Sequence, residues 1–550
     1  MTASRIPTLV LATCCVLGTA GSALATDDAA LAALVDQRLA GDRTGACMAV
    51  AVIESERVAT AYRCADPAHA SRIGPDSAFE IGSVSKTMTA ILLADLIARG
   101  EGSLDDPLTA WLPEGTAVPE FEGQPILLRH VVTHTSGLPA LPSRMQMSSP
   151  VNPYADLTVE ELLASLGDVT LARAPGTQFE YSNFASMLLS YAIARREGVD
   201  FETLLRQKLF EPLGMDTAYV AQRPEGVRAA GGHTPNGLPA AAWTFATDLA
   251  GVGGVRATLD DMVRYVQGNL DASGTPLQAA IELAQRPVSE QPPMAMNWML
   301  VPVADRSVLM HEGGTGGFSS FVSVDRSAQR GVVILSDTSW TSVYGLGSLG
   351  LHLVDASFPL GEPRTAATPA QDLLEGLAGE YQLQGMMKIS LRQRDGTLFA
   401  QAEGQPEFQL AHDSEGDFHP VIVDALLKPR KTSDGSYAFT WMQGGGAIPA
   451  RRLVEDGSAP AAPGLSEAAL AGYAGEYPLM PGFALSVRAG DGGLHAQATG
   501  QGEFPLEAAG PDRFEAPAFG IEILFKRDAH GEVDSLELHQ GGQVLRGERG

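Results

Sequence analysis

Lysine is scarce in this chain. Only six lysines occur among 550 residues, at positions 86, 208, 388, 428, 431 and 526. Lysine and arginine together number 38 against 65 aspartates and glutamates, which gives a formal net charge of −27. Because the basic residues are few and scattered, this composition argues against a nucleic-acid or anionic-membrane binder. We attribute the acidity to solubility.

Long apolar runs are also rare, with one exception at the N-terminus. Arg5 precedes an apolar stretch that ends in Ala23-Leu24-Ala25, a pattern typical of a signal peptide over residues 1–25. No later stretch reaches the roughly 18 uncharged apolar residues that a membrane-spanning helix needs. We therefore expect an exported protein, periplasmic or secreted, and no membrane span. A lipoprotein anchor at Cys14 or Cys15 is the less favoured alternative.

Only two cysteines remain after such a cleavage, Cys47 and Cys64. They flank a segment that reads as a hairpin centred between Ser55 and Glu56, which places Cys47 opposite Cys64 in a non-hydrogen-bonded pair. An oxidising compartment would then permit a disulfide. Two unpaired strand cysteines remain the alternative, because the turn lacks an Asn-Gly type signal.

The first motif that carries chemistry is Ser83-Val84-Ser85-Lys86. Residues three apart share one face of a helix, so the Ser83 hydroxyl and the Lys86 amine can meet. A serine becomes a nucleophile when a neighbour removes its proton, and a lysine does so only if burial lowers its pKa. Of the six lysines, only Lys86 follows a serine by three positions. Taken alone, the motif also fits a solvated lysine beside a capping serine.

Two further motifs follow. Tyr181-Ser182-Asn183 supplies a phenol that can act as acid or base and a side-chain amide that can hydrogen-bond a substrate amide. The same three residues also fit an ordinary turn at the start of a helix, with Asn183 as its cap. His311-Glu312-Gly313-Gly314 continues into Thr315-Gly316-Gly317, and its glycines let a strand approach a ligand closely. A phosphate loop is disfavoured because no Lys-Ser/Thr follows.

In this order, S-x-x-K, Y-x-N and H-x-G, the three motifs resemble the penicillin-binding-type serine hydrolases. These include class C β-lactamases, D-alanyl-D-alanine carboxypeptidases, D-aminopeptidases and related esterases. The resemblance spans about residues 30–355 and includes the segments Thr133–Pro139 and Glu211–Met215. It implies an acyl-enzyme mechanism in which Ser83, Lys86 and Tyr181 are catalytic.

The resemblance also assigns the remaining site residues. The backbone amides of Ser83 and Gly314 would form the oxyanion hole, and Asn183, His311 and Gly313 would bind the substrate. The chain departs from true β-lactamases, because no K-T-G occurs and His311 stands where the family's lysine would be. This favours a peptide-like amide of D-amino acids, or an ester. A class C-like β-lactamase, or a penicillin-binding sensor that acylates without turnover, is the alternative.

We expect no cofactor and no metal. His130 and His134 lie four apart, but the H-E-x-x-H pattern of a zinc site is missing. The run Gly251-Val252-Gly253-Gly254 favours tight strand-to-helix packing over nucleotide binding. The expected partner is a small-molecule or short-peptide substrate, with no nucleic acid; the oligomeric state stays open.

The predicted fold class is α+β. Strand patterns at Cys47–Cys64 and Ser307–Leu335 predict an antiparallel sheet built from both ends of a domain spanning 26–355, flanked by helices and a helical lobe. The segments with helical periodicity are Asp28–Leu39, Thr87–Arg99, Val159–Leu166, Phe184–Arg195, Phe201–Phe210 and Asp260–Leu270.

The C-terminal part carries a duplication. After a Pro/Ala-rich linker at 356–372, Gly379-Glu380-Tyr381 recurs as Gly475-Glu476-Tyr477, and Phe418 recurs as Phe514, a shift of 96 positions in both cases. Short alternating runs separated by Asp-Gly or Gly-Gly turns predict two small antiparallel β-barrel-like repeats, at 373–455 and 465–550. D-aminopeptidases are similar in this arrangement. We interpret the repeats as structural modules that shape or shield the cleft.

Overall fold

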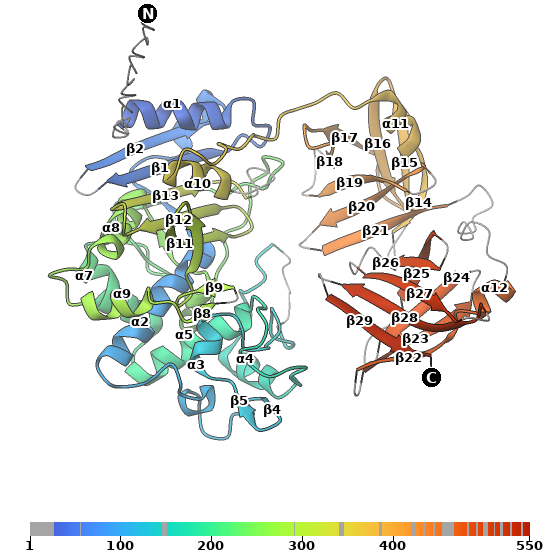
Figure 1. Cartoon of the computed structure of the whole chain (residues 1–550). Helices are drawn as coiled ribbons and strands as arrows, with labels where there is room; N and C mark the ends of the chain where they lie inside the picture. Colours follow the sequence, from blue (N-terminus) through green and yellow to red (C-terminus); the bar gives the residue numbers. More distant parts are fainter. Residues whose placement is uncertain are drawn as a thin grey trace, which may run out of the picture.

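The computed structural model describes residues 27–549 apart from 55–56, 146–150, 291, 340–345, 384–387, 421–424, 433–434, 444–445, 454–466, 481–482, 491–492, 499–503, 511, 517–520, 529–530 and 541–542. A first part, built of a sheet and helices, is followed by two antiparallel β parts (Figure 1). The expected signal peptide lies outside the described residues. No helix among the described residues is long and apolar enough to cross a membrane.

The first part is organised around an eight-stranded sheet, in the order β2-β1-β13-β12-β11-β10-β9-β8. Its strands are β1 Cys47–Glu54, β2 Arg57–Cys64, β8 Ser289–Glu290, β9 Pro293–Met294, β10 Met299–Val303, β11 Arg306–Gly314, β12 Ser319–Asp325 and β13 Arg330–Ser336. The two ends of the part meet where β1 pairs antiparallel with β13, Val50 opposite Ile334. The predicted sheet built from both ends is therefore confirmed.

Helices cover both faces of this sheet. The helices packed on it are α1 Asp28–Leu39 and α10 Gly347–Val354 on one face, and α2 Ser85–Ala98, α8 Leu259–Leu270 and α9 Gln278–Ala284 on the other. Strand β1 is buried on both sides, because Met48 and Val50 belong to the core under α1 and α10, whereas Ala49 and Ala51 belong to the core under α2 and α8. A strand covered on both faces reads as a continuous apolar run, as β1 does.

A helical lobe lies beside α2. Its elements are η3 Leu108–Trp111, β4 Glu120–Phe121, β5 Gln124–Pro125, α3 Leu128–Val132, α4 Val159–Leu166, α5 Asn183–Glu197, α6 Phe201–Leu205, η4 Arg206–Phe210 and α7 Glu211–Leu213. Short segments join the lobe to the sheet: η1 Pro67–Arg72, β3 Ser77–Glu80, η2 Gly82–Val84, β6 Arg228–Ala229, η5 Thr247–Val252 and β7 Arg256–Ala257. Each segment with predicted helical periodicity forms a helix, within a few residues at its ends.

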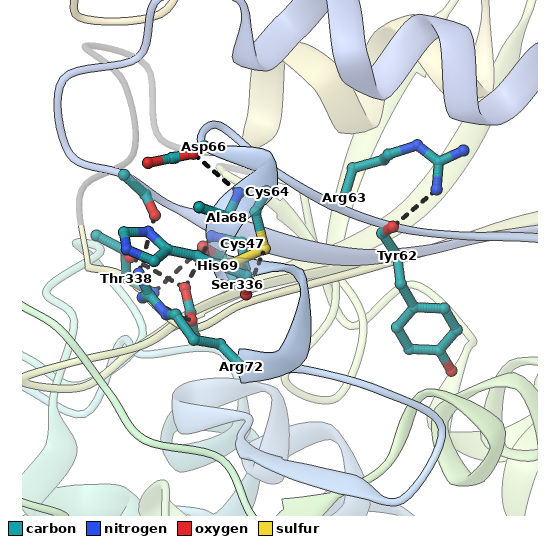
Figure 2. Close-up of a disulfide and its surroundings, with 12 residues drawn as sticks. Cys47, Tyr62, Arg63, Cys64, Asp66, Ala68, His69, Arg72, Ser336 and Thr338 are labelled. Carbon is teal, nitrogen blue, oxygen red and sulfur yellow. Dashed lines mark hydrogen bonds and ion pairs between the residues drawn. A yellow bond between two sulfur atoms is a disulfide. The ribbon is translucent and has the colours of Figure 1, made fainter.

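Cys47 and Cys64 lie directly opposite each other where β1 and β2 pair, and their sulfurs form a disulfide. The next segment, η1, carries Arg72, whose side chain lies close to the disulfide and Thr338 in Figure 2. Arg72 forms an ion pair of 2.6 Å with the buried Asp337, which also accepts the Cys47 N–H at 2.8 Å. Closing a chain loop of this length stabilises the fold by about 3 kcal/mol in the chain-entropy model.

Two antiparallel β parts follow the first part, each preceded by a short helix. The first is a closed barrel: α11 Gln371–Leu377, β14 Gly379–Leu383, β15 Lys388–Arg394, β16 Thr397–Ala402, β17 Phe408–His412, β18 Phe418–Pro420, β19 Leu426–Lys431, β20 Tyr437–Gln443 and β21 Gly446–Arg452. The second is an eight-stranded sheet: α12 Glu467–Ala471, β22 Gly475–Met480, β23 Phe483–Gly490, β24 Gly493–Ala498, β25 Phe504–Gly510, β26 Arg513–Ala516, β27 Ile521–Arg527, β28 Val533–Gln540 and β29 Gln543–Glu548.

The duplication seen in the sequence has a structural counterpart. Tyr381 and Tyr477, which are 96 positions apart, are both fully buried. Each phenol donates a hydrogen bond of 2.8 Å to a backbone carbonyl four residues earlier, Leu377 or Tyr473. The same side chain therefore ties the first strand of each β part to the chain that precedes it.

Candidate active site

Ser83 lies in the turn η2, between the buried strand β3 and the helix α2. From Ser77 to Ala94 it is the only residue that is not buried. The neighbouring Ser85 has a structural role, because its hydroxyl donates to the Gly82 carbonyl at 2.7 Å and accepts the Val255 N–H at 3.2 Å. The turn thus presents one hydroxyl, that of Ser83, at the surface.

Lys86 lies one helical turn after Ser83 and is fully buried. Its Nζ lies 2.9 Å from the Ser83 hydroxyl oxygen and donates to the Val252 carbonyl at 2.7 Å. Burial lowers the pKa of Lys86 well below its ordinary value, and no carboxylate among the described residues compensates for the lost hydration. A neutral amine in contact with a hydroxyl is the arrangement that a lysine base requires.

Tyr181 joins the same group from the loop before α5. Its phenol interacts with the Ser83 side chain, and the Lys86 Nζ lies 5.0 Å from the centre of its ring. The residue as a whole is 37% exposed, but the hydroxyl end is packed against protein, and the loss of water there raises the pKa of Tyr181 above its ordinary value. The phenol therefore stays protonated and can pass a proton on.

His134 supports the other side of Tyr181. The two rings stack with their centres 4.3 Å apart, and the His134 Nδ1 accepts the Ser182 N–H at 3.2 Å. Burial, together with the nearby Lys86 and His311, holds the pKa of His134 well below its ordinary value. A neutral imidazole thus fixes the orientation of the phenol.

Glycines bring the third motif against the turn that carries Ser83. A β-carbon on Gly82, whose φ is +50°, would lie 2.6 Å from the Gly314 nitrogen. A β-carbon on Gly313 would lie 2.0 Å from the Ile81 carbonyl oxygen. The Ser320 hydroxyl also donates to that carbonyl, at 2.7 Å. The end of β11 can reach the Ser83 turn only because glycine occupies these positions.

His311 lies in β11 and is almost fully buried. Its Nδ1 lies 2.6 Å from the Glu312 carbonyl oxygen, which can only accept, so Nδ1 carries the proton and Nε2 remains an acceptor. Burial, with Lys86 nearby, lowers the pKa of His311 to about 4. At neutral pH the third motif therefore offers an uncharged imidazole.

Asn183 is the first residue of α5. Its Nδ2 donates to the Tyr154 hydroxyl at 3.0 Å, and its Oδ1 is buried with no hydrogen-bond partner among the described residues. The Tyr154 ring stacks on Phe245, with centres 4.9 Å apart, and lies 5.3 Å from the Trp243 ring. This leaves one amide oxygen with unused acceptor capacity, beside an aromatic wall.

Two contacts within the site were not predicted from the sequence. The Val252 carbonyl holds Lys86, and the His134 ring packs on Tyr181. Both residues lie in segments that the sequence does mark, the glycine run at 251–254 and Thr133–Pro139. The glycine run differs from the expectation in one respect, because Gly251 lies in the helical turn η5 and not in a strand. A β-carbon on Gly251 would lie 2.5 Å from the Ser190 Cβ and from the Thr89 Oγ1, so η5 packs tightly against both α5 and α2.

The described part of the chain holds no group of three His, Cys, Asp or Glu side chains placed to bind a metal ion. A partly exposed serine, a neutral lysine and a protonated tyrosine meet instead at the boundary between the sheet and the helical lobe. The fold around this site is an antiparallel sheet with helices on both faces and a helical lobe beside it, which is the architecture of the β-lactamase/transpeptidase class.

Comparison with known proteins supports this class. The family model described as Beta-lactamase matches residues 31–343, more than half of the chain, so the chain belongs to the β-lactamase family of serine hydrolases. A model described as a domain of unknown function, DUF3471, matches residues 459–549, which include the second β part.

Three curated relatives illustrate the range of the family. A β-lactamase of Escherichia coli (strain K12) is 30% identical over 339 residues, covering 53% of this chain and 84% of that protein. The D-alanyl-D-alanine-carboxypeptidase/endopeptidase AmpH of the same organism is 35% identical over 230 residues, covering 41% and 57%. Esterase EstB of Burkholderia gladioli is 30% identical over 219 residues, covering 37% and 55%. The matched segments thus span little more than half of the last two proteins.

Proposed function

We propose that the protein hydrolyses peptide-like amides of D-amino acids, or esters, through an acyl-enzyme on Ser83. The observation that carries this proposal is the buried, uncompensated Lys86 amine 2.9 Å from the Ser83 hydroxyl. The neutral amine takes the hydroxyl proton as the Ser83 Oγ attacks the carbonyl carbon. The amides of Ser83 and Gly314 then stabilise the oxyanion.

Tyr181 completes the proton transfers. The proton taken up by Lys86 passes through the phenol to the leaving group, which departs as an alcohol or amine and leaves the acyl group on Ser83. A water molecule then attacks the ester carbonyl as Lys86 takes one of its protons. Lys86 passes that proton to the Ser83 oxygen, so that Ser83 is regenerated as the hydroxyl and the acyl group leaves as a carboxylic acid. Because the pKa of Tyr181 is raised, the phenol acts as a relay while Lys86 acts as the base.

The third motif narrows the substrate class. β-Lactams and peptides with a free C-terminus carry a carboxylate, which a fixed positive charge recognises. The pKa of His311, about 4, leaves no such charge at neutral pH. We infer that the substrate end near His311 is uncharged, as in an ester or an internal amide. The Asn183 Oδ1 accepts an N–H on the acyl side of a peptide-like substrate.

The test is labelling and turnover of the full chain. Wild-type protein should react with a fluorophosphonate probe at Ser83 and hydrolyse a p-nitrophenyl ester, and Ser83→Ala should lose both activities. Ser85→Ala is the matched control and should keep the labelling. A panel of short-chain ester, D-alanyl anilide and chromogenic cephalosporin identifies the substrate. Preference for the cephalosporin would favour the β-lactamase alternative, and labelling without turnover would favour a sensor.

Export is part of the proposal. The disulfide between Cys47 and Cys64 supports an oxidising compartment, because such bonds persist outside the reducing cytosol. The mature protein should begin at Thr26, after the Ala23-Leu24-Ala25 pattern, and N-terminal sequencing of the expressed full chain checks this. A mature protein that still begins at Met1 would contradict it.

A further inference from the structure

A short hairpin spanning residues 232–240 lies between the active site and the first barrel. Its base is closed by the Ala240 N–H, which donates to the Gly232 carbonyl at 2.8 Å. Nearer the tip, the Thr234 N–H donates to the Leu238 carbonyl at 2.8 Å. We call this segment the 232–240 hairpin. Neither end of it carries a residue of the three motifs.

The base of the 232–240 hairpin presses on the turn that follows the third motif. A β-carbon on Gly317 would lie 2.7 Å from the Ala240 Cβ and 2.8 Å from the Gly232 Cα. The His233 N–H also donates to the Gly317 carbonyl at 3.1 Å. Gly317 belongs to the four-residue turn that begins immediately after Gly314 and joins β11 to β12. A shift of the hairpin must therefore displace this turn.

The tip of the same hairpin is held by Arg43, from the loop between α1 and β1. The Arg43 Nη1 donates to the Pro235 carbonyl at 3.0 Å and lies 3.4 Å from the Asn236 Oδ1. Its Nε and Nη2 donate to one carboxylate oxygen of Asp413, at 2.9 and 2.7 Å. One guanidinium thus bridges the hairpin and the first barrel.

Asp413 lies between β17 and β18 of that barrel and is fully buried. Arg364, from the segment before α11, donates to the same carboxylate oxygen at 3.1 Å. Burial alone would raise the pKa of Asp413, but the two guanidiniums outweigh it and hold the pKa below its ordinary value. The carboxylate is therefore ionised at neutral pH. Removing one partner of a buried pair leaves the other charge uncompensated, so the contact strongly resists opening.

We propose that Asp413 is a positioning residue for the active site. Through Arg43 it fixes the 232–240 hairpin, and through the hairpin it fixes the turn next to Gly314, whose amide is the proposed oxyanion donor. The first barrel is then part of the catalytic framework. This inference rests on the proposed acyl-enzyme function, since it assigns a role in stabilising the oxyanion.

The experiment compares Asp413→Asn with Asp417→Asn in the full chain. Asp417 is the matched control, because it pairs with Arg364 and Lys428 in the same network. The readouts are the rate of Ser83 labelling by a fluorophosphonate, the kcat and KM for a p-nitrophenyl ester, and the thermal unfolding curve. Asp413→Asn should lower the labelling rate and kcat by about tenfold, because a displaced oxyanion donor stabilises the transition state less. KM should change little, and Asp417→Asn should label at the wild-type rate.

Two further variants separate positioning from general loosening. Asp413→Glu keeps the charge and should restore most of the lost rate. Arg43→Met should be as slow as Asp413→Asn, and the double variant no slower than either, because both changes remove one bridge. If Asp413→Asn fails to fold, Arg43→Lys tests the bridge instead. A lysine ammonium keeps the ion pair with Asp413 but lacks the second arm of the guanidinium that reaches Pro235, so this variant should also label more slowly than wild type.

Three outcomes would overturn the inference. The first is that Asp413→Asn labels at the wild-type rate, and the second is that Asp417→Asn labels as slowly as Asp413→Asn. The third is that the double variant labels more slowly than either single variant, because the losses in rate of Asp413→Asn and Arg43→Met add. Failure of the wild-type protein to label at Ser83 would be a different result. It would overturn the proposed function itself, and with it this inference.

Discussion

At the scale of single residues, the site is notable for bases that carry no charge. Burial lowers the pKa values of Lys86, His134 and His311, and the nearby Lys86 lowers those of the two histidines further. Three protonated groups in so small a space would repel one another strongly. The proton that leaves Ser83 therefore moves to an uncharged base, so that Lys86 becomes positive while a negative charge develops on the substrate oxyanion.

The charge of the third motif can be altered directly. In His311→Lys, an amine replaces the neutral imidazole, and a carboxylate on the substrate favours its protonated form. We expect the ratio of kcat/KM for a carboxylate-bearing cephalosporin to that for a neutral ester to rise about tenfold, the effect of one added ion pair near 1.4 kcal/mol. His311→Gln is the uncharged control. An equal change of the ratio in both variants would show that size, and not charge, controls the preference.

At the scale of elements, the close approach of β11 to the Ser83 turn depends on glycine. The two glycines of the third motif differ in what surrounds them. A β-carbon on Gly313 would overlap the Ile81 carbonyl oxygen at 2.0 Å, whereas one on Gly314 would have its nearest neighbour, the Phe318 carbonyl oxygen, at 3.9 Å. The first contact involves a backbone atom that has little freedom to move.

This difference gives a paired prediction. Gly313→Ala should destabilise the protein by about 3 kcal/mol, because a methyl group is forced into a filled space between two backbone segments. Gly314→Ala should stay within about 1 kcal/mol of wild type, because its β-carbon meets only ordinary contacts. Urea unfolding followed by tryptophan fluorescence measures both. Equal stability of the two variants would contradict the observed packing.

At the scale of the whole molecule, the structure shows which features a sequence can reveal. The sheet, the helices and the barrel-like repeats carry local signals, such as alternating runs, caps and a recurring Gly-Glu-Tyr, and the predicted fold class is confirmed. The three motifs are short, so the candidate site could be written down residue by residue. Their roles remain proposals that the geometry supports.

Contacts between distant segments could not be anticipated in the same way. The Val252 carbonyl meets Lys86 across 166 positions, and Asp413 meets Arg43 across 370. No local sequence pattern indicates that the Val252 carbonyl will contact the buried Lys86 amine. Likewise, nothing in the sequence distinguishes Asp413 from the other acidic residues as the partner of Arg43. The tight packing of the glycine run against helices was predicted, but the run begins in the helical turn η5 and not in a strand.

The central claim is that Lys86 is uncharged when it activates Ser83. The most direct measurement is the pH dependence of the rate at which a fluorophosphonate labels Ser83, in wild type and in Tyr181→Phe. The reactive form has a neutral lysine, so the rate should fall as the pH drops through the pKa of Lys86. The midpoint should lie well below 10.5, the ordinary lysine value, in both proteins. A midpoint near that value, or one that disappears when the phenol is removed, would contradict the account.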